Sequence, residues 1–370
     1  GLVMSAGTNI GFADNHIETD VVTLSTDSGG SSGTFITEES DITVDELTVS
    51  INRIANDGAV PGSTTDTSQE DMTATNDGNI VLQTNDGFIT VNGGSTSTGM
   101  SAAGNILLQS RETGEDPEDD ADDINLNASV TSTAGNISLN SADGITQAAD
   151  GDIETQAADK TIDVWALSEI SMNDGAESTA SANANIRYYA QGGALTLGSI
   201  DAGTSDVSLY ALNSITDSGS TDTDVIAKEL RIQTAADESG SAGATDNHLE
   251  ISVDELSADV DSGGLFLTEA DDITITDTSA IAVKRIGSDA TVASSPEDAI
   301  QSDLVSDGHL VLVTTHGFIT LEDGADADNN SVTAVSNIFI KSGESGEGTD
   351  TDDDHITLNA ALRSSSGNIR

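Results

Sequence analysis

The sequence predicts an all-β fold, a parallel β-solenoid of short stacked strands with long loop excursions. Two observations lead to this prediction. First, an apolar–polar–apolar triplet recurs along the chain, as in Ile-Ser-Leu at residues 137–139. Such period-2 alternation sends both apolar side chains to one face of a strand. Second, strand starts follow one another at steps of 8 or 9 residues, as from Ile145 to Ile153 and Ile162. Units this short bury their apolar side chains only by stacking on their neighbours.

Composition agrees with short strands joined by small polar turns. Aromatic residues make up 3% of the chain, and the 370 residues include 36 glycines but only three prolines. Strands of Ile, Val, Leu and Thr between Gly, Ser, Asp and Asn would give this balance, whereas amphipathic helices would not. High charge with modest hydrophobicity is also typical of disordered chains. The regular spacing of Ile and Leu argues against disorder.

The apolar positions of the triplets form the predicted core. Spacing alone does not decide how many faces each coil has, because two faces would need about 17 residues and three faces about 25. Either arrangement would stack coils about 4.8 Å apart. The side chains that we expect inside are Ile80, Leu82, Ile106, Leu108, Ile124, Leu126, Ile137 and Leu139.

A longer repeat lies over the short one. The tripeptide Asn-His-Ile at residues 15–17 returns as Asn-His-Leu at 247–249, a shift of 232. We therefore divide one continuous solenoid into a first long repeat, residues 1–232, and a partial second, residues 233–370. We also expect the natural chain to continue beyond residue 370 with a stretch that resembles residues 139–232.

Two corresponding loops interrupt the strand pattern. Residues 56–76 and 287–307 match across the long repeat, and they carry Pro61 and Pro296 respectively. Because proline cannot donate a hydrogen bond to a strand ladder, we expect both loops to leave the stack.

Charge limits the classes of partner. The chain holds 65 acidic and 11 basic residues, a formal charge of −54, which argues against direct binding to nucleic acid or to an anionic bilayer. No stretch of 18 apolar residues occurs, so we expect no membrane insertion. Cysteine is absent, which excludes disulfides and thiolate metal sites. Cations are the natural counterpart of such a surface.

The Gly-Asn-Ile runs at residues 78–80, 104–106 and 135–137 resemble the repeats of filamentous-haemagglutinin-like giant bacterial surface proteins. This resemblance implies a secreted or surface-anchored bacterial protein with a role in adhesion, cell contact or fibre formation. We therefore expect an extracellular structural segment, either an adhesin stalk or a fibre-forming unit, with a self-assembling filament or sheath subunit as the alternative. The implied partners are other copies of the chain, end to end or side by side, or a glycan or protein receptor on a cell surface. The strong acidity departs from the family and indicates a salty or calcium-rich setting.

Two acidic loops are the candidate metal site. Carboxylates crowd into residues 115–123 and again, one long repeat later, into 350–354. Dense oxygen ligands suit Ca²⁺, although neither loop has EF-hand spacing, and a solvated run of charge is the competing interpretation. Ca²⁺ is the only cofactor that we expect. The candidate ligands are Glu115, Asp116, Asp119, Asp120, Asp122, Asp123, Asp350, Asp352, Asp353 and Asp354.

We do not expect an enzyme, and we assign no catalytic residue. Some β-solenoids degrade polysaccharides, and His316 before Gly317 suggests a glycosidase histidine, but Asp86 precedes Gly87 at the matching place. A repeat that varies there favours an exposed turn. Arg187 and Arg231 occupy outward strand positions, where we expect surface ion pairs. Four aromatic residues are expected to pack in or over the core, with stacking on sugar rings as the alternative: Trp165, Tyr188, Tyr189 and Tyr210.

Overall fold

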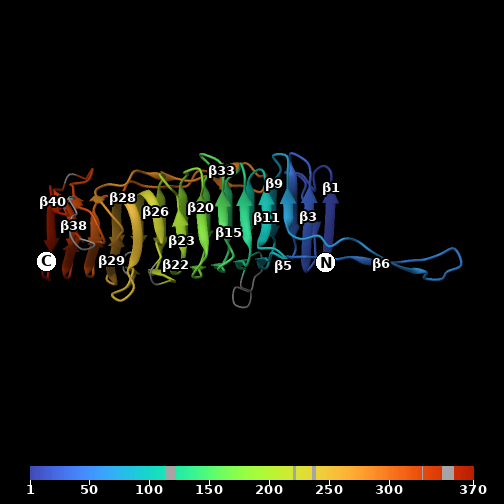
Figure 1. Ribbon diagram of the computed structural model, residues 1–370, viewed down its shortest axis with the longest axis horizontal. Helices are drawn as coiled ribbons and strands as arrows, with labels where there is room; N and C mark the ends of the chain where they lie inside the picture. Colours follow the sequence, from blue (N-terminus) through green and yellow to red (C-terminus); the bar gives the residue numbers. More distant parts are fainter. Residues whose placement is uncertain (113–121, 220–221, 236–238, 327, 344–353) are drawn as a thin grey trace, which may run out of the picture.

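The chain forms one long stack of β-coils with a hairpin that projects beyond its N-terminal end (Figure 1). This computed structural model describes residues 1–112, 122–219, 222–235, 239–326, 328–343 and 354–370. The fold is all-β, as predicted, and these residues contain no helix. Within the described residues, a sheet of 35 strands carries the stack, and three two-stranded sheets form the hairpins. The parallel β-solenoid prediction is therefore confirmed.

The strands are short, and most have three to six residues. The first part of the stack and its hairpin comprise β1 (Leu2–Ala6), β2 (Ile17–Thr19), β3 (Thr23–Ser28), β4 (Gly33–Glu38), β5 (Ile42–Val44), β6 (Ser50–Arg53), β7 (Gly62–Thr65), β8 (Met72–Ala74), β9 (Asn79–Thr84), β10 (Ile89–Val91), β11 (Thr98–Ala102), β12 (Ile106–Gln109) and β13 (Ile124–Leu126). The middle comprises β14 (Ser129–Ser132), β15 (Ile137–Ser141), β16 (Ile145–Gln147), β17 (Ile153–Thr155), β18 (Ile162–Ala166), β19 (Ile170–Met172), β20 (Glu177–Ala180), β21 (Ile186–Ala190), β22 (Leu195–Leu197), β23 (Ser199–Asp201), β24 (Val207–Ala211) and β25 (Ile215–Asp217).

Two long strands, of 10 and 12 residues, open the last part of the chain, and each pairs with more than one strand of a neighbouring coil. This part comprises β26 (Val225–Thr234), β27 (Ser241–Ala242), β28 (Leu249–Val260), β29 (Gly264–Glu269), β30 (Ile273–Ile275), β31 (Ile281–Ala282), β32 (Arg285–Ile286), β33 (Val292–Ser294), β34 (Glu297–Asp298), β35 (Leu304–Ser306), β36 (Leu310–Thr314), β37 (Ile319–Leu321), β38 (Asn330–Ala334), β39 (Ile338–Lys341), β40 (Ile356–Leu358) and β41 (Ala361–Ser364).

Each coil has three strands. Through the middle of the stack a strand pairs in parallel with the third strand after it, as β15 does with β18 and β16 with β19. Ile137 lies beside Ile162, and Ile145 beside Ile170, so that one coil takes 25 residues there. Of the two arrangements that the spacing left open, the structure has three faces per coil.

The core is a column of mostly apolar side chains that runs along the stack. All eight side chains predicted to lie inside are at most 1% exposed. Because each sits directly above its equivalent in the previous coil, burial depends on the neighbouring coil rather than on a separate layer. Thirteen stacked positions set the length of the body at about 60 Å: Ile10, Thr34, Ile80, Ile106, Ile137, Ile162, Ile186, Val207, Leu230, Leu256, Ile275, Leu321 and Leu358.

The Gly-Asn-Ile motif has a structural role at the corner before the strand that it opens. The side-chain oxygen of Asn105 accepts a hydrogen bond from the backbone N–H of Asn136 at 2.7 Å, and Asn79 does the same for Asn105 at 2.8 Å. A Cβ on Gly135 would lie 2.1 Å from the carbonyl carbon of Gly104, so only glycine fits between these coils. The motif residues therefore join successive coils.

The two excursions are β-hairpins that begin earlier than the sequence predicts. The first comprises residues 46–70 around β6 and β7, and the second comprises residues 277–302 around β31 to β34. The prediction placed their starts at residues 56 and 287, which are near the hairpin tips. Proline marked only the return strand, whereas the outgoing strand alternates like the strands of the stack. We call residues 46–70 the free hairpin and residues 277–302 the strap.

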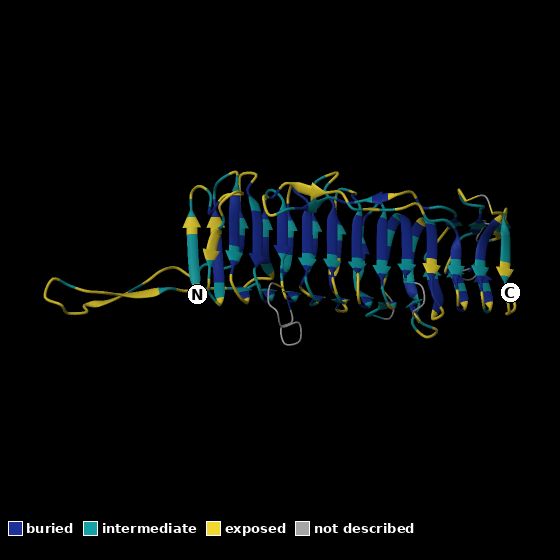
Figure 2. Cartoon of the chain, turned by 180° about the vertical axis from the view of Figure 1, so that it is seen from behind, coloured by how far each residue is buried: buried dark blue, intermediate teal, exposed yellow. Residues whose placement is uncertain are grey.

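The free hairpin and the strap differ in where they lie. Figure 1 shows the free hairpin beyond β1, whereas the strap runs back along the side of the stack towards the N-terminal end. Figure 2 shows, from behind, that the free hairpin is almost entirely exposed, whereas the strap lies along one edge of the stack.

Candidate functional site

The predicted calcium loops fall largely outside the described residues. This holds for Glu115, Asp116, Asp119 and Asp120 of the first loop and for Asp350, Asp352 and Asp353 of the second. The Ca²⁺ prediction therefore remains a prediction for them.

The described members of these loops stabilise turns. Asp122 Oδ1 accepts a hydrogen bond from the N–H of Gly87 at 2.6 Å, and Asp354 Oδ1 accepts one from Gly317 at 2.9 Å, one long repeat later. Asp123 Oδ1 accepts the N–H of Gly144 at 2.9 Å, and burial raises the pKa of Asp123. Each carboxylate thus bonds a backbone N–H in a neighbouring coil.

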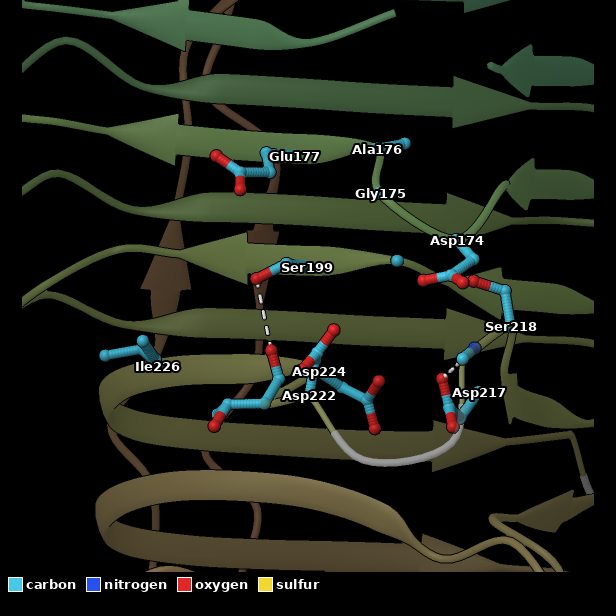
Figure 3. Close-up of a pocket in the computed structure, with 13 residues that line it drawn as sticks. Asp174, Gly175, Ala176, Glu177, Ser199, Asp217, Ser218, Asp222, Asp224 and Ile226 are labelled. Carbon is cyan, nitrogen blue, oxygen red and sulfur yellow. Dashed lines mark hydrogen bonds between the residues drawn. The ribbon is translucent and has the colours of Figure 1, made fainter. Parts of the chain in front are cut away.

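A different acidic group, which the sequence did not single out, lies between two coils. Asp217 ends β25, Asp224 precedes β26 and Glu250 lies in β28, and carboxylate oxygens of all three lie within 4.8 Å of one another. Asp217 and Asp224 border a cavity of about 280 Å³ that Asp174 and Asp222 also line (Figure 3). We call Asp217, Asp224 and Glu250 the acidic cluster.

Three carboxyl groups this close cannot all carry charge at low cost. Asp224 is 2% exposed, and its Oδ2 accepts the backbone N–H of Glu250 at 2.8 Å. Burial raises the pKa of Asp224 to about 9, and the charge of Asp217 adds to the shift. Among the described residues, Asp217 Oδ2 and Glu250 Oε2 are buried and have no hydrogen-bond partner. A proton or a cation would neutralise this arrangement, and oxygen ligands are those that Ca²⁺ and Mg²⁺ take.

A second acidic group occupies the corner before β35. Asp303 is 4% exposed, and its carboxylate lies within 4.8 Å of those of Asp326 and Asp328. Burial, followed by the charges of Asp326 and Asp328, raises the pKa of Asp303 to about 7. Asp328 also accepts the N–H of Asn330 at 2.7 Å, so part of this group stabilises the loop.

The sequence alone would reveal these two acidic groups only if the number of residues per coil were already known. Asp224 and Glu250 are 26 residues apart, close to the 25-residue coil, so one lies nearly above the other. The two-face alternative would have placed them on different faces. Without the number of faces, these carboxylates look like ordinary members of a very acidic chain.

The aromatic residues pack as the core-or-cover interpretation predicts. Tyr188 is fully buried, and its hydroxyl donates to Gln147 Oε1 at 2.6 Å, while burial raises its pKa. Tyr189 and Tyr210 stack on each other with ring centroids 4.2 Å apart. Trp165 lies 5.8 Å from the Arg285 guanidinium, which belongs to the strap.

The recurring histidines make equivalent contacts. His16 Nδ1 lies 2.8 Å from Thr37 Oγ1, and His248 Nδ1 lies 2.9 Å from Thr268 Oγ1. His316 Nδ1 bonds the carbonyl of Ala270 at 3.2 Å and is exposed. Each of these rings bonds a group in a neighbouring coil, as expected of a turn residue.

Comparison with family models, with curated proteins and with solved structures finds no match to this chain. Within the described residues, no helix is long and apolar enough to cross a bilayer.

Proposed function

We propose that this chain is a structural segment of an extracellular bacterial surface or secreted protein, where it acts as a stalk or fibre-forming spacer and not as an enzyme. The observation that carries the proposal is the stack of thirteen positions, in which each coil bonds the next in parallel register from Ile10 to Leu358. Such an array grows in length with every repeat and not in thickness, which suits a spacer.

The Gly-Asn-Ile corners support the extracellular assignment, because they are the residues that resemble filamentous-haemagglutinin-like surface proteins. The charge of −54 supports it as well, since a highly charged surface keeps a long rod soluble and separate from its neighbours. Divalent cations from the surroundings would lower the repulsion between carboxylates. Ca²⁺ is the expected ion, at the loops 115–123 and 350–354.

Immunogold electron microscopy with antibodies against this chain tests the proposal. We expect labelling of intact cells, or of fibres released from them, without permeabilisation. Labelling only after permeabilisation would contradict the extracellular assignment. Release of reducing sugar from a polysaccharide by the purified chain, abolished by one Asp→Asn substitution, would contradict the structural role.

A further inference from the structure

The free hairpin and the strap are the same structure at two places. Ser50 pairs with Thr65 in the free hairpin, and Ala282 pairs with Glu297 in the strap, a shift of 232 at both partners. The tip turns also match. Ala55 N bonds Ala59 O, and Gly287 N bonds Thr291 O, both at 2.9 Å. The turn residue with positive φ is Gly58 in one and Ala290 in the other.

The strap docks on the flank of the stack through apolar side chains. Ile286 and Ala290 are 3% and 5% exposed and form a cluster with Phe35, Val81 and Leu107, which lie on the outside of β4, β9 and β12. These three flank residues are at most 2% exposed. Outward-facing side chains of a solenoid are buried in this way only where another segment covers them.

Ion pairs fix the position of the strap along the flank. Arg285 Nε donates to Asp163 Oδ2 at 2.7 Å, and Asp298 accepts from Arg187 Nε at 2.9 Å and from Ser208 Oγ at 2.7 Å. The sequence predicted a surface position for Arg187, and this prediction is wrong. Arg187 is 6% exposed and lies beneath the strap. The flank supplies one carboxylate and one guanidinium, and the strap supplies their partners.

The free hairpin carries the same docking residues, but the described structure gives it no flank to bind. Arg53, Ile54 and Asp66 are identical to Arg285, Ile286 and Asp298 at the shift of 232. Ile51, the counterpart of the buried Val283, is 58% exposed, and Ile54 is 68% exposed, whereas Ile286 is 3% exposed. Apolar side chains at these positions have no evident use in a hairpin that remains in water.

We propose that the free hairpin is a docking strap for the flank of a further copy of this repeat, stacked against the N-terminal end of the solenoid. It would bind as the strap binds here, with Ile54 over the counterparts of Phe35, Val81 and Leu107. Arg53 would pair with the counterpart of Asp163, and Asp66 with that of Arg187. Each long repeat would thus be clamped onto the one before it. This inference goes beyond the proposed function and stands on the two hairpins alone.

A graft within the full chain tests the inference, because the chain contains one complete flank. Residues 48–68 replace residues 280–300, a stretch of equal length, and trypsin then reports on the Arg–Ile bond that both hairpins contain. Proteolysis follows the population of the undocked state. We expect the bond at 285–286 to be cut at least about tenfold more slowly in the graft than the bond at 53–54 of the same molecule.

Two matched variants make every outcome decisive. The same graft with Ile286→Asp should lose this protection, because a carboxylate cannot replace the buried isoleucine. A chain with a Gly-Ser linker at 280–300 gives the melting temperature without any strap, and the graft should melt above it. A graft that is cut at both bonds equally fast, melts with the linker variant, or fails to fold would overturn the inference, and would point to a partner other than this repeat.

Discussion

Arg285 and Asp163 form an ion pair between segments 122 residues apart, with Arg285 Nε 2.7 Å from Asp163 Oδ2. The Asp163 side chain is fully buried, and its other oxygen lies 3.3 Å from Arg187 Nη1. One carboxylate of the stack thus balances a guanidinium from its own coil neighbour and another from the strap. The same carboxylate therefore links two neighbouring coils to each other and both of them to the strap.

Removal of this carboxylate should destabilise the protein strongly. Asp163→Ala leaves Arg285 without its carboxylate and leaves Arg187 with Asp298 alone, and breaking a buried pair in this way costs about 3–5 kcal/mol. We expect a loss of that size in the free energy of unfolding, measured in urea. Asp150→Ala, at an exposed position, is the control and should change it by less than about 0.5 kcal/mol. Equal effects of the two substitutions would contradict the role of Asp163.

The stacked core makes a separate prediction. Ile137→Ala removes a fully buried side chain between Ile106 and Ile162 and should cost about 2–5 kcal/mol, because neighbouring coils cannot close the cavity. Val22, which is 75% exposed, provides the matched control, and Val22→Ala should be nearly neutral. Local hydrogen exchange should rise in the coils next to residue 137 first. Uniform exchange across the stack would argue against coil-by-coil burial.

Stability should fall as pH rises through the neutral range. Burial raises the folded pKa of Asp224 to about 9 and that of Glu269 to about 8, well above unfolded carboxyl values near 4. The folded state therefore binds more protons in this window, so their stabilising contribution is full at about pH 4 and is lost as pH rises to 9. Thermal melts from pH 5 to pH 9 should show a falling melting temperature.

A substitution separates this effect from general charge repulsion. Asp224→Asn keeps the hydrogen bond from Glu250 N but cannot ionise, so it should raise the melting temperature at pH 9 more than at pH 5. Asp222→Asn, at an exposed position that lines the same cavity, removes an equal charge and should have a small, pH-independent effect. The same response to both variants would mean that only net charge matters.

The calcium prediction is tested by comparing salts. If Ca²⁺ binds the loops 115–123 and 350–354, CaCl₂ should raise the melting temperature more than NaCl at equal ionic strength, and a chelator should reverse the gain. A variant with four substitutions should lose the part of the rise in melting temperature that is specific to calcium. The substitutions are Asp119→Asn, Asp120→Asn, Asp352→Asn and Asp353→Asn. Identical melting curves in the two salts would mean that the ions only screen the negative charge and that no specific calcium site exists.

The fold was predictable because its signal is local. Alternation at Ile137 and Leu139 assigns their side chains to one face without knowledge of any partner strand. The number of faces was not predictable, because two-strand and three-strand coils both place a strand every 8 or 9 residues. Strand pairings such as that of Ile137 with Ile162 distinguish them.

The sites were harder to predict because they form between segments that are far apart in the sequence. By the alternation of its strand, Arg187 points outward like a surface residue. The strap that covers it includes Asp298, which is 111 residues later in the sequence. Asp217, Asp224 and Glu250 meet only once the coil length is known. A chain with 65 acidic residues offers many such combinations, so composition hides the few that are buried.

The central claim is that each long repeat adds a fixed length to one continuous rod. Electron microscopy of a chain with a second copy of residues 1–232 ahead of residue 1 tests it directly. At about 25 residues per coil and about 4.8 Å per coil, we expect the body to lengthen from about 60 Å to roughly 105 Å at unchanged thickness. A body of unchanged length, or two beads joined by a flexible link, would contradict the account.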